Sequence, residues 1–324
     1  MTERQTNAAA TLIGLSPLLY LVPGAQARAL GGAAWIGCLG ALPVLALFGW
    51  LLKKRPVRTP GRLAAAGLAL WLMAAAAAVL HGCAARYSTA VGVFRSPIPY
   101  AVLLLLTAVP AALSRKKALF RASEVFLPVV LALLGVVLLC AAKQLRPARL
   151  IDLTSVTLPN AARAALPVCC VGLAALVLPR VYAGAQPGAA PGIGLAGIAG
   201  LLCAAAVSAL GAPMTAQLAL PVFTLLRNLS LLHTVERLDA LMAAVWILPD
   251  VTLLALLLRA GGDSAARALA LPQGRAPVLV TAALAAGGAV LINAQGQGFP
   301  ERFAPVLAGG LAAIALLTSV QKRA

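Results

Sequence analysis

The scarce acidic side chains are the residues of this chain that could most readily do chemistry. The sequence has eight Asp and Glu residues, and three of them fall in one short segment, VERLDALMAAVWILPD. Glu236, Asp239, Trp246 and Asp250 follow one another at intervals of three, seven and four residues, so a helix would place them on a single face. A carboxylate on such a face can carry a proton or pair with a cation.

Depth separates Asp250 from the other two carboxylates. Glu236 and Asp239 would lie at the start of the helix, where the positive end of the helix dipole favours carboxylates, so capping alone could account for them. Arg237 projects to another face. Asp250 follows Glu236 by fourteen residues, about 21 Å along a helix axis. An unpaired carboxylate at that depth of a membrane costs a few kcal/mol, so we expect Asp250 to be protonated, paired or in a water-filled cavity. It is then either a functional residue or a neutral structural one.

The first apolar segment contains helix-breaking residues at membrane depth. Its sequence, GLSPLLYLVPG, includes Ser16, Pro17, Tyr20 and Pro23. Pro17 removes a backbone donor and crowds the preceding turn, and backbone groups freed in this way must face protein or a cavity. Interrupted helices of this kind build substrate sites in secondary transporters. The alternative is an ordinary proline kink.

A second interrupted helix is predicted in the sixth apolar segment, which contains Pro167, Gly172 and Pro179. The first and sixth segments correspond if the chain consists of two inverted five-helix repeats, each beginning with a broken helix. The candidate ligand-binding residues are therefore Ser16, Pro17, Tyr20, Gly172, Trp246 and Asp250.

The elements that must position these residues are membrane-spanning helices. The chain of 324 residues is 62% hydrophobic and 10% charged, with a mean hydropathy of +0.96, far more apolar than a soluble domain. We predict an all-α membrane protein that forms a single integral membrane domain over residues 1–324. The ten predicted spans are 8–27, 33–52, 63–82, 98–113, 122–142, 165–182, 192–210, 234–258, 276–293 and 303–320.

The formal net charge of +18 is explained by sidedness. Lys and Arg concentrate in short gaps such as KKRPVRTPGR and SRKKALFR, and the positive-inside rule then places both termini in the cytoplasm. We expect contact with membrane lipid and none with nucleic acid. An alternative for residues 8–27 is a signal peptide with a cleavage site at Ala25–Ala27.

Catalytic and metal-binding motifs are not apparent in the sequence. It contains no HExxH, no paired-Asp magnesium motif and no phosphate-binding loop, so we expect neither an enzyme nor a metal or cofactor. The six cysteines lie mostly in apolar runs and are interpreted as buried structural thiols. Glycines in GGAAWIGCLG and GIGLAGIAG indicate close helix packing.

The segment LPVFTLLRNLSLLHTVERLDALMAAVWIL resembles the B-subunit permease family of bacterial spore germinant receptors. The matching residues, which include candidates for contact with a partner, are Pro221, Arg227, Glu236, Arg237, Asp239 and Trp246. SRKKALFRASEVFLP, with Arg121, Glu124 and Pro128, resembles the family's junction between helices four and five. The chain departs from the family in having Ala33 and Ala34 where an Asp commonly precedes the tryptophan of helix two.

The resemblance implies the fold of the amino acid–polyamine–organocation transporter superfamily, with two inverted five-helix repeats and broken helices one and six. It implies a sensor in the spore inner membrane that binds a small germinant, often an amino acid, between helices one, three, six and eight, and assembles with an A and a C subunit. A stand-alone proton-coupled amino-acid transporter, with Asp250 as proton carrier, is the alternative. A structural membrane scaffold is a third possibility.

Overall fold

The computed structural model describes residues 2–54, 60–94, 96–228, 238–294 and 310, and every regular element in these ranges is helical, as predicted. The long helices are α1 (Glu3–Leu30), α2 (Ala34–Lys54), α3 (Arg62–Val91), α4 (Ile98–Leu113), α5 (Lys116–Ala142), α6 (Leu158–Ala183), α7 (Ala190–Leu210), α10 (Leu238–Ala268) and α11 (Arg275–Ala294). The short helices are η1 (Gly31–Ala33), η2 (Pro147–Leu150), α8 (Ala212–Gln217) and α9 (Pro221–Arg227).

The helices have the length and composition of membrane spans. Within the described part of the chain, seven helical segments are long and apolar enough to cross a bilayer, and one of these, Glu3–Lys54, contains both α1 and α2. Helix α4 is apolar but only 16 residues long. These segments support an integral membrane protein. Each of the first nine predicted spans overlaps a described helix. Residues 234–237 of the eighth span lie outside the described residues, as does the tenth span, 303–320, except for Gly310.

Local sequence signals account for several helix ends. At the start of α1, the Thr2 hydroxyl accepts from the Gln5 N–H while the Gln5 side chain accepts from the Thr2 N–H, which is a capping box. Helix α6 begins after Thr157, whose side chain accepts from the Asn160 N–H, and ends at Gly184 with a φ of 63°. A left-handed backbone at this position favours glycine.

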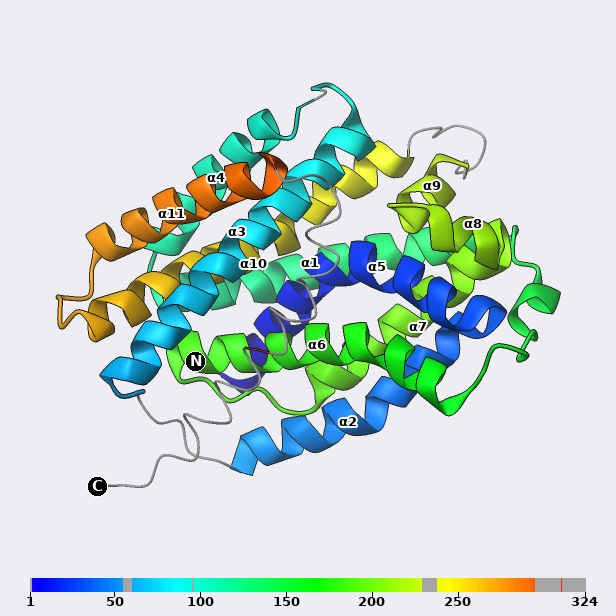
Figure 1. Ribbon diagram of the computed structural model, residues 1–324, viewed down its shortest axis with the longest axis horizontal. Helices are drawn as coiled ribbons and strands as arrows, with labels where there is room; N and C mark the ends of the chain where they lie inside the picture. The colour runs from blue at the N-terminus through cyan, green and yellow to red at the C-terminus, as the bar shows by residue number, and fades with distance from the viewer. Residues whose placement is uncertain (1, 55–59, 95, 229–237, 295–309, 311–324) are drawn as a thin grey trace.

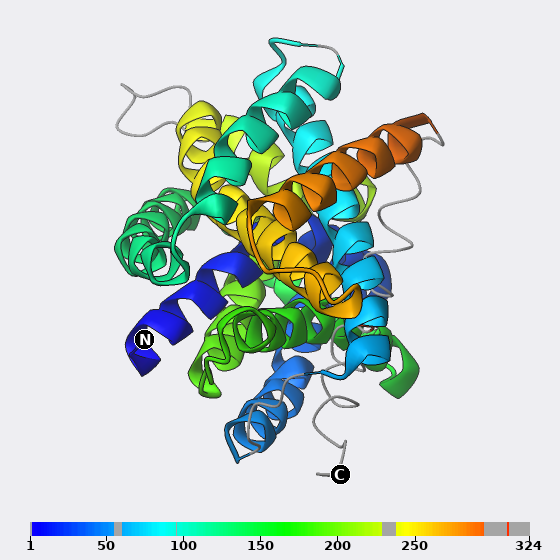
Figure 2. The ribbon, with the colours of Figure 1, turned by 90° about the vertical axis from the view of Figure 1, so that its left-hand side faces the viewer.

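The long helices other than α5 form two groups of four (Figures 1 and 2). In the first helix group, α1, α2, α6 and α7, each helix packs against the other three. The same holds in the second helix group, α3, α4, α10 and α11. Helix α10 joins the groups by packing against α1 and α6, and α5 also contacts both α1 and α10. The contact between α3 and α10 is the most extensive of any pair of described helices.

The prediction that the first and sixth helices are broken is wrong, because each is one continuous α-helix in the structure. Helix α1 continues through Pro17 and Pro23, and α6 continues through Pro167 and Pro179. A single proline removes only one backbone hydrogen bond, and membrane helices tolerate that loss where neighbouring helices hold them in place. Leucines on both sides of Pro17 are fully buried and provide that support. The two inverted five-helix repeats remain a prediction.

Apolar side chains cover much of the outer surface, as expected for helices that face lipid. Leu106 on α4, Val125 and Leu139 on α5, Leu201 on α7 and Leu291 on α11 are each more than half exposed. In a soluble monomer this much exposed apolar surface would be unusual. The surface therefore agrees with the membrane assignment made from helix length.

Close approach of α10 to α11 depends on Gly262. A Cβ atom there would lie 2.8 Å from the backbone N of Val278 and 2.9 Å from its Cα, so Gly262→Ala must push the helices apart. We expect the free energy of unfolding to fall by about 1–3 kcal/mol, measured by titrating the purified chain with a denaturing detergent. Gly287→Ala on α11 is the control, because no other atom lies within 4 Å of the added Cβ. Equal stability of the two variants would contradict the prediction.

Candidate functional site

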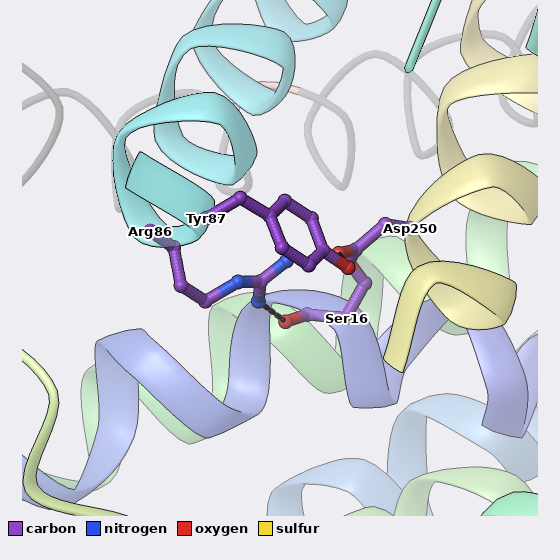
Figure 3. A network of polar contacts seen from close by, with 4 residues as sticks. All are labelled: Ser16, Arg86, Tyr87 and Asp250. Atoms are coloured by element: carbon purple, nitrogen blue, oxygen red, sulfur yellow. Dashed lines mark hydrogen bonds and ion pairs between the residues drawn. The ribbon is translucent and has the colours of Figure 1, made fainter. Parts of the chain in front are cut away.

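Asp250 lies at the centre of a buried polar network between three helices (Figure 3). The Ser16 hydroxyl of α1 donates to Oδ1 at 2.7 Å, and the Tyr87 hydroxyl of α3 donates to Oδ2 at 2.8 Å. The Arg86 guanidinium, also from α3, forms an ion pair with Oδ2. Asp250 is therefore paired, which is one of the states that the sequence predicted for it.

The Arg86 guanidinium also contacts a backbone carbonyl and two aromatic rings. One N–H group donates to the Ser16 carbonyl oxygen at 3.3 Å, next to Pro17. The rings of Tyr20 and Tyr87 each lie with their centroids 5.2 Å from the guanidinium carbon, within the range of a cation–π interaction. The network thus joins α1 to α3 as well as to α10.

Both charges of the network are removed from solvent. The side chains of Arg86 and Asp250 are each 1% exposed. Removing such ions from water costs several kcal/mol each, which is recovered only when charge pairing and hydrogen bonds are nearly complete. The Asp250 carboxylate meets this condition because three donors from two other helices reach it. Removal of either Arg86 or Asp250 would therefore leave the charge of the other buried and unpaired.

Two buried donors at or near the site lack an acceptor. Arg86 Nε and Trp246 Nε1 have no hydrogen-bond partner among the described residues. Trp246 is fully buried and lies one turn before Asp250 on α10. Buried N–H groups without acceptors are uncommon. They are therefore places where an acceptor atom of a ligand or water could bind.

The structure brings most of the predicted ligand-binding residues into one region. Ser16 and Asp250 are in direct contact, and Tyr20 faces Arg86 across its ring. Gly172 is placed differently. A Cβ atom there would lie 2.6 Å from the methyl groups of Leu45 on α2, so this glycine permits close packing within the first helix group. No described contact joins Gly172 to the network.

Two of the residues that carry the family resemblance, Pro221 and Arg227, lie on α9, whereas Trp246 lies on α10 one turn before Asp250. Pro221 begins α9 and Arg227 ends it. Arg227 donates to the carbonyls of Thr89 and Ala90 at 3.0 and 2.9 Å, which caps the end of α3. Predicted residues Glu236 and Arg237 lie outside the described residues, as does the side chain of Asp239, whose backbone belongs to the first turn of α10.

Arg86 and Tyr87 were not predicted from the sequence. The third span was predicted to run to about residue 82 or further, and α3 continues to Val91 and includes both residues in its last two turns. A signal was present in HGCAARYSTAV, because Arg86 is a lone cation flanked mostly by small residues. A deeply placed Asp250 requires such a partner.

A second buried carboxylate, Asp263, lies about 20 Å further along α10. Its two oxygens are paired with Lys116 Nζ at 2.9 Å and with Arg259 Nε at 3.2 Å. Lys116 also donates to the Tyr182 carbonyl at 3.1 Å. Each carboxylate oxygen lies within ion-pair distance of its own cation, although neither oxygen accepts a hydrogen bond among the described residues. We interpret this cluster as a structural tie between α5, α6 and α10. Within the described ranges, no three His, Cys, Asp or Glu side chains gather as metal ligands.

No protein-family model matches this chain, and no curated protein matches it significantly. The geometry around Asp250 and the resemblance of residues 220–248 are therefore the features from which a function can be inferred.

Proposed function

We propose that the chain is a permease-like membrane protein that binds a small zwitterionic ligand, such as an amino acid, where α1 meets α3 and α10. The observation that carries this proposal is the buried network of Arg86 and Asp250 with Ser16 and Tyr87. Ser16 belongs to the first helix group, whereas Arg86, Tyr87 and Asp250 belong to the second. In permeases, the ligand site lies between two bodies that move relative to each other.

The chemistry of the network favours a ligand with both charges. An amino acid offers a carboxylate to Arg86 and an ammonium group to Asp250, so it can replace the internal ion pair without leaving either charge unpaired. A ligand with one charge would leave the opposite residue buried and uncompensated, which costs several kcal/mol. The vacant donors Arg86 Nε and Trp246 Nε1 are further partners for ligand oxygens.

Ligand binding would act on the packing of the two helix groups. The internal network ties α1 of the first group to α3 and α10 of the second. A ligand inserted between Arg86 and Asp250 has to change these ties. A ligand shifts a conformational equilibrium only if it makes different contacts in the two states. Replacement of the Arg86–Asp250 ion pair by contacts with the ligand would provide such a difference.

We further propose that this chain is the germinant-sensing subunit of a spore germinant receptor. The resemblance of residues 220–248 supports this role, and Arg227 of that segment caps the end of α3 next to Arg86 and Tyr87. Assembly with A and C subunits, a spore inner-membrane location and two inverted five-helix repeats follow from the same resemblance, and the positive-inside rule supports cytoplasmic termini. Co-purification of an A and a C subunit with the tagged chain from spores tests the assembly.

Thermal unfolding of the full chain in lipid nanodiscs tests the ligand class. We expect at least one of the standard amino acids to raise the Tm, since a ligand that binds only the folded state stabilises it. The amine formed by decarboxylating that amino acid, and its N-acetyl derivative, should not raise the Tm, because each lacks one charge. Stabilisation by the amine or by the N-acetyl form to the same extent would contradict a zwitterionic site.

A proton-coupled transporter, with Asp250 as the proton carrier, is the alternative. A neutral Asp250 would have a weaker interaction with Arg86, which lies in the same helix group, beside the Ser16 contact that reaches the first helix group. Uptake of the amino acid into proteoliposomes that depends on a proton gradient, and that is lost in Asp250→Asn but kept in Asp263→Asn, would identify the chain as a transporter. Binding without uptake would favour the sensor.

A further inference from the structure

A groove of about 570 Å³ lies away from the Asp250 network, between α1, α5 and the start of α7. Figure 2 shows the N-terminal end of α1 beside α5 on the side of the molecule where this groove lies. The residues that define its character are Arg4, Asn7, Thr11, Glu124, Leu127 and Leu131.

One end of the groove carries a positively charged and a negatively charged side chain. Arg4 Nε lies 2.9 Å from Glu124 Oε1, and the side chains are 85% and 28% exposed. The same end of α1 is polar throughout, because Glu3 pairs with Lys53 at 2.8 Å and the Asn7 side-chain oxygen accepts from the Gly188 N–H at 2.9 Å. This end therefore has the character of the lipid headgroup region.

The remainder of the groove is apolar. Leu127 and Leu131 follow Glu124 on α5 at intervals of three and four residues, so they continue the same helix face. The Thr11 hydroxyl donates to the Asn7 carbonyl at 2.9 Å within α1 and is not available to a ligand as a donor. Val125 and Val129 beside the groove are 64% and 50% exposed. The groove thus opens beside a surface that faces lipid.

We propose that this groove binds one phospholipid with an ethanolamine headgroup. The lipid phosphate pairs with the Arg4 guanidinium and the ammonium group donates to the Glu124 carboxylate, so each charge of the headgroup meets its opposite. One acyl chain lies along Leu127 and Leu131. A glycerol headgroup has no cation for Glu124, and a choline headgroup has no N–H donor, so both fit less well.

Native mass spectrometry of the purified full chain tests the proposal. The chain is mixed with equal amounts of phosphatidylethanolamine, phosphatidylcholine and phosphatidylglycerol that carry identical acyl chains. We expect the ethanolamine lipid to exceed each of the others by about fivefold, the size of a partly exposed charge-assisted hydrogen bond. Glu124→Gln should remove this preference, while Lys117→Gln, an exposed charge on the same helix outside the groove, should not.

Filling the groove provides a second readout that does not depend on charge. Leu127→Trp should abolish the retained lipid, whereas Val129→Trp, on the lipid-facing side of α5, should leave it in place. A preference for phosphatidylglycerol, or full lipid retention in Leu127→Trp, would overturn the proposal.

Discussion

Replacing Asp250 with leucine is expected to lower the free energy of unfolding by about 3–5 kcal/mol, because it leaves the Arg86 guanidinium buried without its counter-charge. The Tyr87 and Ser16 hydroxyls lose their acceptor at the same time. Adding Arg86→Met to this variant should restore most of the lost stability, since a well-packed apolar pair of similar volume often replaces a buried ion pair without cost. Titration of the purified proteins with a denaturing detergent measures each step.

Asp263→Leu on the same helix is the matched control. It removes a carboxylate that is also buried, but one of its partners, Lys116, is 32% exposed and can recover hydration. The loss of stability should therefore be smaller than for Asp250→Leu, at about 1–2 kcal/mol. Failure of Arg86→Met to rescue Asp250→Leu would show that the Asp250 carboxylate stabilises the fold through contacts other than the ion pair.

The doubly substituted protein also separates stability from function. If the Arg86 and Asp250 pair were only a structural tie, a stable Arg86→Met, Asp250→Leu protein would still be stabilised by an amino acid. We expect it to fold and to show no rise in Tm with any amino acid, because both charges that would hold the ligand are gone. A rise equal to that of the unmodified chain would place the ligand elsewhere.

The positions of the helices could be predicted because long apolar runs leave few alternatives in a membrane protein. The end of α3 was missed because polar residues near Arg86 have the appearance of a loop, whereas burial against α10 keeps them helical. The sequence also predicted that Asp250 is protonated, paired or in a water-filled cavity, and the structure shows the paired state. The sequence could not show which of the 26 Lys and Arg residues supplies the charge, since the pair is 164 positions apart and depends on tertiary packing.

The wrong prediction of interrupted helices has a different physical explanation. Pro17 and Gly172 were interpreted by the same rule, that proline and glycine inside a span mark an interrupted helix. Both residues are also compatible with a continuous helix, where proline bends the axis and glycine admits a neighbour. Leu45 occupies the space beside Gly172, and only the packing of α2 against α6 decides between the two roles.

Amino-acid affinity is expected to fall about tenfold or more when Arg86 is replaced by lysine, although the positive charge is kept. The Arg86 guanidinium reaches Asp250 and the Ser16 carbonyl at once and lies between the rings of Tyr20 and Tyr87. Lysine has a compact ammonium group that cannot reproduce the planar geometry with which arginine binds a carboxylate. Loss of one charge-assisted hydrogen bond of about 1.5 kcal/mol gives the tenfold change.

Calorimetric titration with the amino acid that gives the largest rise in Tm measures this effect, and Arg149→Lys is the control. Arg149 donates to the carbonyls of Ser208 and Ala209 outside the site, so the same substitution there should leave affinity unchanged. Retention of affinity in Arg86→Lys would mean that the ligand needs only a positive charge at this position. Loss of affinity in both variants would indicate a general change in packing, and the guanidinium of Arg86 would then have no special part in ligand recognition.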